Sequence, residues 1–332
     1  MRSRFLSCLL AAGMLLGAAV SADAAEKLIV YTSMKESLIG KLRDGFVKKH
    51  PNIAMDYQSA GAGKLMAKIA AERESGKILA DVVWTSEVPD FYNMKNEGIL
   101  AEYVSPLLSE ILNPFDDSVK GFFTPARLGT LGIAINTRFI KTPPTQWADL
   151  SNKEYRGAFG IANPSLSGTS YMSVALLVKQ FGWEFIGKLR DNKAKIGKGS
   201  GQVIDDTASG DLVACLAVDY ITNDKISKGA TLSLVYPPEM LVVPSPVAIM
   251  KNSPNMSAAQ KFVDFLLSRE GQTVIASEGT LPVRGDVPVP DAFKLPKPAD
   301  AMKRAIKIDY LQIIKEKENT VKKFSDILQG KS

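Results

Sequence analysis

Residues 28–33 read LIVYTS, and residues 80–86 read ADVVWTS. Each stretch contains a short, unbroken apolar run that ends in a Thr-Ser pair, which is typical of a strand buried on both faces of a parallel sheet. The polar pair marks the carboxyl end of the strand, and that edge is where open α/β sheets bind their ligands. The two stretches therefore predict a layered α/β protein with polar loops at one edge of its sheet.

Helical patterns lie next to these strands. Residues 37–50 and 64–75 carry apolar side chains at helical spacing, and a further strand is predicted between them at 53–57. The alternation resumes later in the chain, where apolar runs predict strands at 159–162 and 213–219. Strand–helix alternation in two separate blocks predicts two α/β units.

Two long extended runs, 128–136 and 241–250, flank the second unit. We interpret them as strands that cross between two lobes, so that the C-terminal helices, including a charged helical stretch at 299–330, return to the first lobe. A cleft is then expected between the lobes. The expected division is a signal peptide at 1–24, a first lobe formed by 25–127 and 251–332, and a second lobe at 128–250 that includes the hinge strands.

The first residues have the pattern of a secretory signal peptide. Arg2 and Arg4 precede an apolar stretch at 5–20, and the small residues of Ala22-Asp23-Ala24 form a cleavage site. The apolar stretch is short for a membrane span, and Cys8 lies too deep inside it for a lipoprotein cysteine. We therefore expect export to the periplasm, after which Cys215 is the one remaining cysteine and no internal disulfide forms.

The composition excludes several classes of function. The chain has 332 residues, 41 Lys and Arg against 35 Asp and Glu, two Cys and one His. One His and two Cys leave almost nothing for a zinc site or for a Ser-His-Asp or Cys-His catalytic group. The mild positive charge is spread along the chain, without a nucleic-acid-binding motif. We therefore predict a protein that has no cofactor or metal site, lacks a His-dependent catalytic group and does not bind nucleic acid.

Four polar loops each follow a strand and precede a helix. Helix N-termini at such positions offer free backbone N–H groups and a partial positive charge, and Ser and Thr add hydroxyl donors. Each loop alone has a plainer interpretation as a helix cap or turn, and Lys64 in the AGAGK stretch lacks the spacing of a nucleotide-binding loop. The coincidence of four loops predicts an oxyanion receptor, with contacts from Ser33, Ala62, Gly63, Thr85, Ser86, Ser167, Gly168, Thr169 and Ser170.

A second group of polar residues ends strands in the second half of the chain. Asp219, Tyr220 and Glu239 are predicted to accept hydrogen bonds from hydroxyl or amine groups of a ligand, or to stack on a ring. Arg127 and Arg284 lie beside extended runs, where a guanidinium suits either a ligand carboxylate or phosphate, or an interdomain salt bridge.

The order of these segments resembles a known family. LIVYTS, ADVVWTSEVPDFYNMKNEGIL, GTLGIAINT, VVPSPVAIMKNSPN and AAQKFVDFLLSREGQ together resemble the periplasmic substrate-binding proteins of ABC importers, in the branch with ferric-ion, thiamine, phosphonate and sugar-phosphate receptors. The resemblance covers about 26–290. It implies the two-lobe, type II periplasmic-binding-protein fold of the α/β class, with two crossover hinge strands and a central cleft. It also implies binding without catalysis and delivery to an inner-membrane permease.

The residues at the family's ligand positions favour an anion over iron. Iron-binding members typically use two adjacent Tyr with a His and a Glu, whereas this chain has Asp219-Tyr220 and no His in its first loop. The resemblance therefore implies a monomeric periplasmic receptor for a small phosphate ester or phosphonate. A ferric-ion receptor and a thiamine or thiamine-phosphate receptor, with Trp84, Tyr220 and Tyr236 as aromatic walls, stay as alternatives. A secreted hydrolase and a structural adhesin are the alternatives outside the family.

Overall fold

The computed structural model of the chain describes residues 26–116 and 119–331. The predicted signal peptide at 1–24 lies outside the described residues. Within the described ranges, no helix combines the length and the apolar character that crossing a membrane requires.

In the part of the chain that the structure describes, a single sheet of nine strands runs through the molecule, in the order β2-β1-β3-β9-β4-β7-β5-β6, with β8 paired to β4. The α/β class is confirmed. The strands are β1 (Glu26–Thr32), β2 (Ile53–Ser59), β3 (Val82–Trp84), β4 (Thr124–Asn136), β5 (Phe159–Ala162), β6 (Lys195–Gly197), β7 (Ala214–Val218), β8 (Leu232–Val235) and β9 (Leu241–Ile249).

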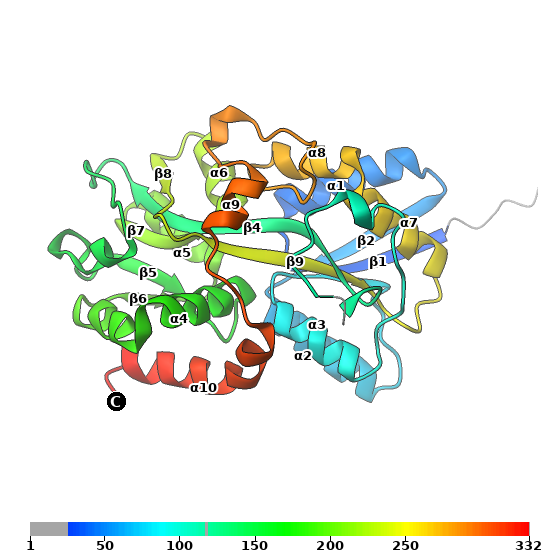
Figure 1. Cartoon of the computed structure of the whole chain (residues 1–332), viewed down its shortest axis with the longest axis horizontal. Helices are drawn as coiled ribbons and strands as arrows, with labels where there is room; N and C mark the ends of the chain where they lie inside the picture. The colour runs from blue at the N-terminus through cyan, green and yellow to red at the C-terminus, as the bar shows by residue number, and fades with distance from the viewer. Residues whose placement is uncertain (1–25, 117–118, 332) are drawn as a thin grey trace, which may run out of the picture.

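Two long strands link the halves of the sheet. β4 and β9 pair antiparallel and run across the molecule, with β1 to β3 on one side and β5 to β8 on the other (Figure 1). Both strands were predicted from their extended runs, and both are buried along nearly their whole length because helices and loops cover their two faces.

The register of these strands sets the direction of the two parallel sets. Trp84, at the end of β3, pairs with Val247, which in turn pairs with Thr124 at the start of β4. Val218, at the end of β7, pairs with Leu131 of β4. β1 and β2 run parallel to β3, and β5 and β6 run parallel to β7. The carboxyl ends of both sets therefore face each other across the middle of β4 and β9.

Ten α-helices cover the sheet. They are α1 (Glu36–Lys49), α2 (Ala62–Glu74), α3 (Val88–Asn96), α4 (Gly168–Asp191), α5 (Ser200–Ser209), α6 (Asp219–Ser227), α7 (Met256–Leu267), α8 (Arg269–Ser277), α9 (Pro298–Arg304) and α10 (Tyr310–Leu328), among the described residues. α4 is kinked at Gly182, where a φ of 71° breaks the helical backbone.

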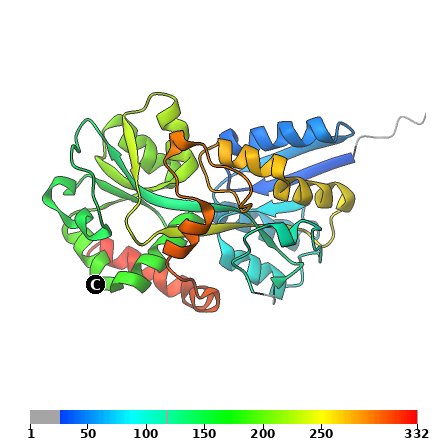
Figure 2. The ribbon, with the colours of Figure 1, turned by 45° about the horizontal axis from the view of Figure 1, so that its top comes forward.

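The C-terminal segment contacts both halves of the molecule. α7 and α8 pack on α1 beside β1 to β3, as the predicted first lobe requires. α10 instead lies along α4, beneath the other half of the sheet (Figures 1 and 2). The Tyr171 hydroxyl of α4 donates a hydrogen bond to the Ile313 carbonyl of α10. The charged pattern at 299–330 predicted helix correctly but did not identify the surface that the helix covers, and the lobe boundaries stay a prediction.

A buried ionic cluster joins α10 to the start of α3. Lys317 of α10 pairs with Glu87 and, at 3.0 Å, with Asp90. Burial, together with the negative charge of Asp90, raises the pKa of Glu87 to about 7 despite the opposing effect of Lys317. Burial likewise raises the pKa of Asp90. The Tyr171 ring lies against the same ammonium, with Lys317 Nζ 5.8 Å from its centroid.

This cluster predicts a pH dependence of stability. The folded protein holds a proton on Glu87 more tightly than the unfolded chain does, so the contribution of Glu87 to stability is greatest below its usual pKa of about 4.5 and is lost as the pH rises through about 7. We expect Glu87→Gln to reduce this fall in the melting temperature between pH 5 and 7.5. The control is Glu97→Gln, which removes an exposed carboxylate paired with Arg73. If the melting temperatures of wild type and Glu87→Gln fell equally between pH 5 and 7.5, Glu87 would not be the source of the pH dependence.

Candidate functional site

A cleft of about 480 Å³ lies where the two sets of strand ends meet. This volume is within the range of small-molecule binding sites. Its walls come from loops that follow strands on both sides of β4 and β9. The lining residues are Ser33, Lys35, Ser59, Ala60, Gly61, Ala62, Lys64, Ser86, Arg127, Leu166, Ser167, Gly168, Thr169, Lys198, Gly199, Ser200, Gly201, Gln202, Val218, Tyr220 and Ile221.

Five helices begin at this cleft. Their N-cap residues all line it: Lys35 for α1, Gly61 for α2, Ser167 for α4, Gly199 for α5 and Val218 for α6. Among these five residues, only the Ser167 side chain accepts a hydrogen bond from its own helix, from the N–H of Ser170. The first N–H groups of a helix have no partner within the helix, and the helix dipole places partial positive charge there. The convergence builds a surface that attracts an anion.

Three hydroxyl groups form a cluster at two of these N-termini. Ser167 Oγ lies 3.1 Å from both Thr169 Oγ1 and Ser200 Oγ, and the last two are 3.2 Å apart. A hydroxyl rotates freely and both donates and accepts. The cluster can therefore turn its protons toward an oxyanion without moving a backbone atom.

The charged side chains of the cleft wall are all cationic. Lys35, Lys64 and Lys198 line it together with Arg127, and no Asp or Glu is among the lining residues. The three lysines are exposed, and none has an ion-pair partner within the part of the chain that the structure describes. Their charge adds to that of the helix N-termini.

Arg127 and Tyr220 form the inner wall of the cleft. The guanidinium carbon lies 4.9 Å from the centroid of the Tyr220 ring. Burial raises the pKa of Tyr220 to about 12, although the Arg127 charge opposes this shift. The Tyr220 hydroxyl accepts a hydrogen bond from the N–H of Lys35, at 3.0 Å. Because Lys35 and Tyr220 lie in opposite halves of the molecule, this bond ties the two sides of the cleft together.

The rims of the cleft touch at three glycines. A Cβ atom at Gly61 would lie 2.6 Å from the carbonyl oxygen of Leu166, and one at Gly63 would lie 2.9 Å from that of Ser165. A Cβ atom at Gly168 would lie 2.5 Å from Cβ of Glu87. Real Cβ atoms do not approach other atoms so closely. The loops after β2 and β3 therefore pack against the loop after β5 with no room for a side chain.

The structure brings seven of the twelve predicted site residues to the cleft wall. All three predicted loops from the first half and the one before α4 contribute. The seven are Ser33, Ala62, Ser86, Ser167, Gly168, Thr169 and Tyr220.

Five predicted residues do not line the cleft. Thr85 and Ser170 are buried, and the Ser170 hydroxyl donates to the carbonyl of Ala162. Gly63 lies at the contact between the rims. The Glu239 carbonyl accepts from Trp147 Nε1 at 2.9 Å, in the connection between β8 and β9. Asp219 is fully buried and is occupied by protein donors.

The Asp219 carboxylate has a structural role and does not line the cleft. Its Oδ1 accepts from Arg127 at 3.2 Å and from the N–H of Tyr220 at 2.7 Å. Its Oδ2 accepts from the N–H and the hydroxyl of Thr130 and from the hydroxyl of Thr280, at 2.7–2.9 Å. Five donors leave the carboxylate no lone pair to offer a ligand, which corrects the prediction that it contacts one.

A fifth loop, which was not predicted from the sequence, runs from Lys198 to Gln202 and begins α5. The residues before it, Lys195–Gly197, form a short strand that is largely exposed and lacks an apolar run. The Gly-Ser-Gly stretch at 199–201 was the available signal, because it has the same composition as the other loops.

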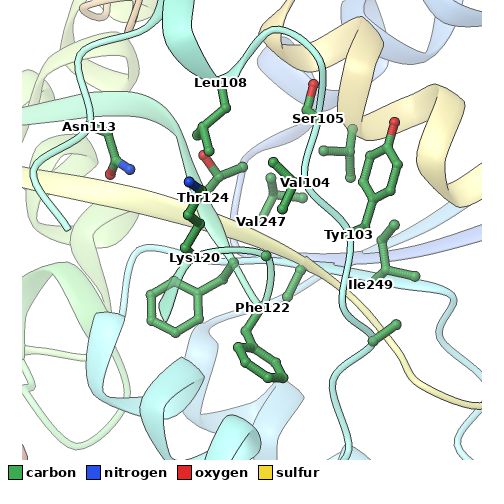
Figure 3. A pocket seen from close by; sticks show the side chains of 15 residues that line it. Tyr103, Val104, Ser105, Leu108, Asn113, Lys120, Phe122, Thr124, Val247 and Ile249 are labelled. Carbon is green, nitrogen blue, oxygen red and sulfur yellow. The ribbon is translucent and has the colours of Figure 1, made fainter. Parts of the chain in front are cut away.

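A second pocket lies beside β4 and β9, away from this cleft. Tyr103, Val104, Leu108 and Phe122 are among its walls (Figure 3). The Tyr103 hydroxyl donates to Asp264 of α7, at 2.7 Å. The open volume is about 20 Å³, which holds about one water molecule and no organic ligand.

The described residues do not form a metal site. In the described ranges, no three or more His, Cys, Asp or Glu side chains gather in an arrangement that holds a metal ion. The cleft itself offers one phenol, Tyr220, and no carboxylate.

Comparison with known sequences identifies the family. A family model described as bacterial extracellular solute-binding protein matches residues 77–312. An uncharacterized protein of Haemophilus influenzae is 29% identical over 82% of this chain and 81% of its own length. The phosphoglycerate transport regulatory protein PgtC of Salmonella typhimurium is 29% identical over 60% of this chain and 52% of its own. A putative 2-aminoethylphosphonate-binding periplasmic protein of the same species is 23% identical, covering 74% and 73%.

Solved structures share the fold. The periplasmic binding protein AfuA of Actinobacillus pleuropneumoniae, with fructose-6-phosphate bound, superposes with a TM-score of 0.79 at 24% identity, over 91% of this chain and 98% of its own. Iron-bound HitA of Pseudomonas aeruginosa gives a TM-score of 0.75 at 24% identity, over 91% and 99%. The predicted type II periplasmic-binding-protein fold is confirmed.

Proposed function

This chain belongs to the bacterial extracellular solute-binding proteins, the receptors that deliver a solute to an ABC importer, and we propose that its solute is a small organic phosphate or phosphonate. The cleft between the two halves is the binding site in this proposal. Export to the periplasm through cleavage near residue 24 is part of it, because that is where such a receptor meets its permease.

One observation carries the proposal: the charged groups on the cleft wall are all positive. Lys35, Lys64 and Lys198 lie around five helix N-termini, and Asp and Glu are absent from the wall. Such a wall repels cations and binds oxyanions through N–H and hydroxyl donors, and a hydrogen bond to a charged group contributes about 1.5–3 kcal/mol. A phosphate or phosphonate dianion offers three oxygens to these donors. It also supplies the negative charge that the wall lacks.

The sequence relatives support the same class of solute. PgtC is named for phosphoglycerate transport, and a second relative is named as a putative 2-aminoethylphosphonate-binding protein. Both printed names contain a small organophosphorus compound. The chain spans about half of the length of PgtC. The name of PgtC therefore supports the class of solute proposed for this chain, but not that this chain has the whole activity of PgtC.

A ferric ion is less well matched by the cleft. Fe³⁺ is a hard cation, which oxygen anions bind best. The wall supplies the phenol of Tyr220, whose pKa of about 12 favours the protonated form, and no carboxylate. Three unpaired lysines would also repel the ion.

Thiamine is matched less well for a similar reason. It carries a positive charge, and one aromatic residue, Tyr220, lines the cleft. Trp84 is fully buried and donates its indole N–H to the Ser245 carbonyl. Tyr236 donates to the Thr130 hydroxyl, whose own proton goes to Asp219, and is outside the lining. The aromatic walls that this alternative requires are therefore not assembled.

The contact between the rims suggests how the solute is held. We infer that the two halves separate at Gly61, Gly63 and Gly168 to admit the solute, and return to the contact described above once its oxygens engage donors from both sides. Closure removes water from the charged pair of solute and cleft, which strengthens each hydrogen bond. The closed form then presents both halves together to the permease.

The proposal predicts the outcome of a ligand screen by thermal shift. We expect glycerol 3-phosphate or 2-aminoethylphosphonate to raise the melting temperature, because a ligand at 100 times its Kd adds about 2.7 kcal/mol of stability. Thiamine and Fe(III) serve as the competing ligands, with inorganic sulfate as the control for a bare dianion. Stabilisation by Fe(III) or thiamine but by no organophosphorus compound would refute the proposed class of solute.

The hydroxyl cluster predicts a loss of affinity. Thr169→Ala removes one donor to the bound oxyanion and should weaken binding about tenfold, measured by calorimetric titration with the best ligand of the screen. Thr273→Ala is the control, since its hydroxyl lies exposed on α8 and donates to the carbonyl of Arg269. Equal affinities of the two variants would remove Thr169 from the site.

The rim contact predicts that a single methyl group blocks closure. Gly168→Ala places a Cβ against Glu87 and should weaken ligand binding by about tenfold or more, while the protein stays folded. Gly187→Ala is the matched control, because it lies in the same helix with nothing within 4 Å. That control should add roughly 0.5–1 kcal/mol of stability and leave affinity unchanged. Wild-type affinity in Gly168→Ala would show that binding does not need the rims to meet.

A further inference from the structure

Arg127 is a buried cation that reaches the cleft with one edge unused. Its side chain is 1% exposed, and it comes from β4, one of the two strands that link the halves. Nη1 donates to Asp219 at 3.2 Å and to the Thr280 hydroxyl at 2.6 Å. Nε has no hydrogen-bond partner within the described part of the chain. No hydrogen bond involving Nη2 is found there either.

The free donors form one side of the guanidinium. Nε–H and one N–H of Nη2 point in the same direction, and together they match the two oxygens of a carboxylate. A buried donor without an acceptor is unfavourable, and such groups in native proteins call for an explanation. Because Arg127 is part of the cleft wall, an acceptor brought by the solute supplies one.

The surroundings fix the position of the guanidinium. Asp219 binds the opposite side of the guanidinium, and its remaining lone pairs are taken by Thr130, Thr280 and Tyr220. The Tyr220 ring packs against the guanidinium face. A Cβ atom at residue 129 would lie 2.8 Å from Nη2, so the glycine there leaves the space that the guanidinium fills.

We propose that the free edge of Arg127 binds a carboxylate of the solute, so that the receptor recognises a phosphorylated or phosphonylated carboxylic acid. The proposal rests on the function proposed above and narrows it. The phosphorus group occupies the helix N-termini and the lysines near the rims, and the carboxylate occupies Arg127 on the inner wall. Two separate anionic groups also match the two sets of donors, which are the helix N-termini with their lysines and the free edge of Arg127.

The test compares two solutes on the wild-type protein. 3-Phosphoglycerate and glycerol 3-phosphate share three carbons and a phosphate ester, and they differ in a carboxylate against a hydroxymethyl group. Calorimetric titration should give at least tenfold tighter binding of 3-phosphoglycerate. Equal or weaker binding, with glycerol 3-phosphate still bound, overturns the carboxylate site and leaves the proposed function intact. Binding of neither, with no organophosphorus hit in the screen, overturns both.

Substitution of Arg127 assigns the preference to this side chain. Arg127→Lys keeps a positive charge for Asp219 and removes the two parallel donors. We expect its affinity for 3-phosphoglycerate to fall at least tenfold, toward that for glycerol 3-phosphate, which should change little. An equal loss for both solutes would place Arg127 on the phosphate and contradict the proposal.

The control for this variant is Arg284→Lys. Arg284 is also largely buried and is paired with carboxylates, Asp286 and Glu110, but it is absent from the cleft wall. It should leave the ratio of the two affinities unchanged. Circular dichroism melting confirms that each variant is folded, and the comparison of solutes on wild type decides the proposal even if Arg127→Lys unfolds.

Discussion

The antiparallel pairing of β4 with β9 is the constraint on which the site depends. It links the halves, and the pairing of β3 with β9 and of β7 with β4 makes their parallel strands run toward each other. In a parallel set, each strand is followed by a helix whose N-terminus lies near the carboxyl end of the strand. Two such sets facing each other bring the starts of five helices to one cleft. The positive character of the cleft is thus largely a consequence of topology.

This arrangement is costly while the cleft is empty. Partial positive charges of helix N-termini and three lysines without ion-pair partners repel one another, and no carboxylate on the wall balances them. The lysines reduce the cost by remaining exposed to water. Arg127 cannot do so, and Asp219 offsets its charge from behind. On the wall of the cleft, Asp219 thus offsets the charge of the buried Arg127, whereas the three exposed lysines have no ion-pair partner within the described residues.

The sequence predicted local features of this site well and distant partners poorly. A Ser or Thr that directly follows a buried apolar run, such as Ser33 or Ser86, is recognisable from its neighbours in the chain. Asp219 was equally visible at a strand end, but its role depends on Arg127 and Thr280, which lie 92 and 61 residues away. The loop at Ser200 was missed because β6 is short and exposed. The same reasoning explains α10: amphipathic charge predicts a helix, whereas its contact with α4 is a matter of tertiary packing.

The glycine at the start of α4 connects the rim contact to the buried ionic cluster. Gly168 packs against Glu87, and Glu87 also pairs with Lys317 of α10, so one carboxyl group contacts segments from three parts of the chain. Burial raises the pKa of Glu87 to about 7, and part of that burial comes from the packing of α4 against it. Any separation of the rims would hydrate this carboxyl and favour its charged form, whereas contact favours the protonated one. If the halves open and close as proposed, the free energy of closure depends on the protonation of Glu87 as well as on the solute, and α10 influences it through Lys317 without lining the cleft.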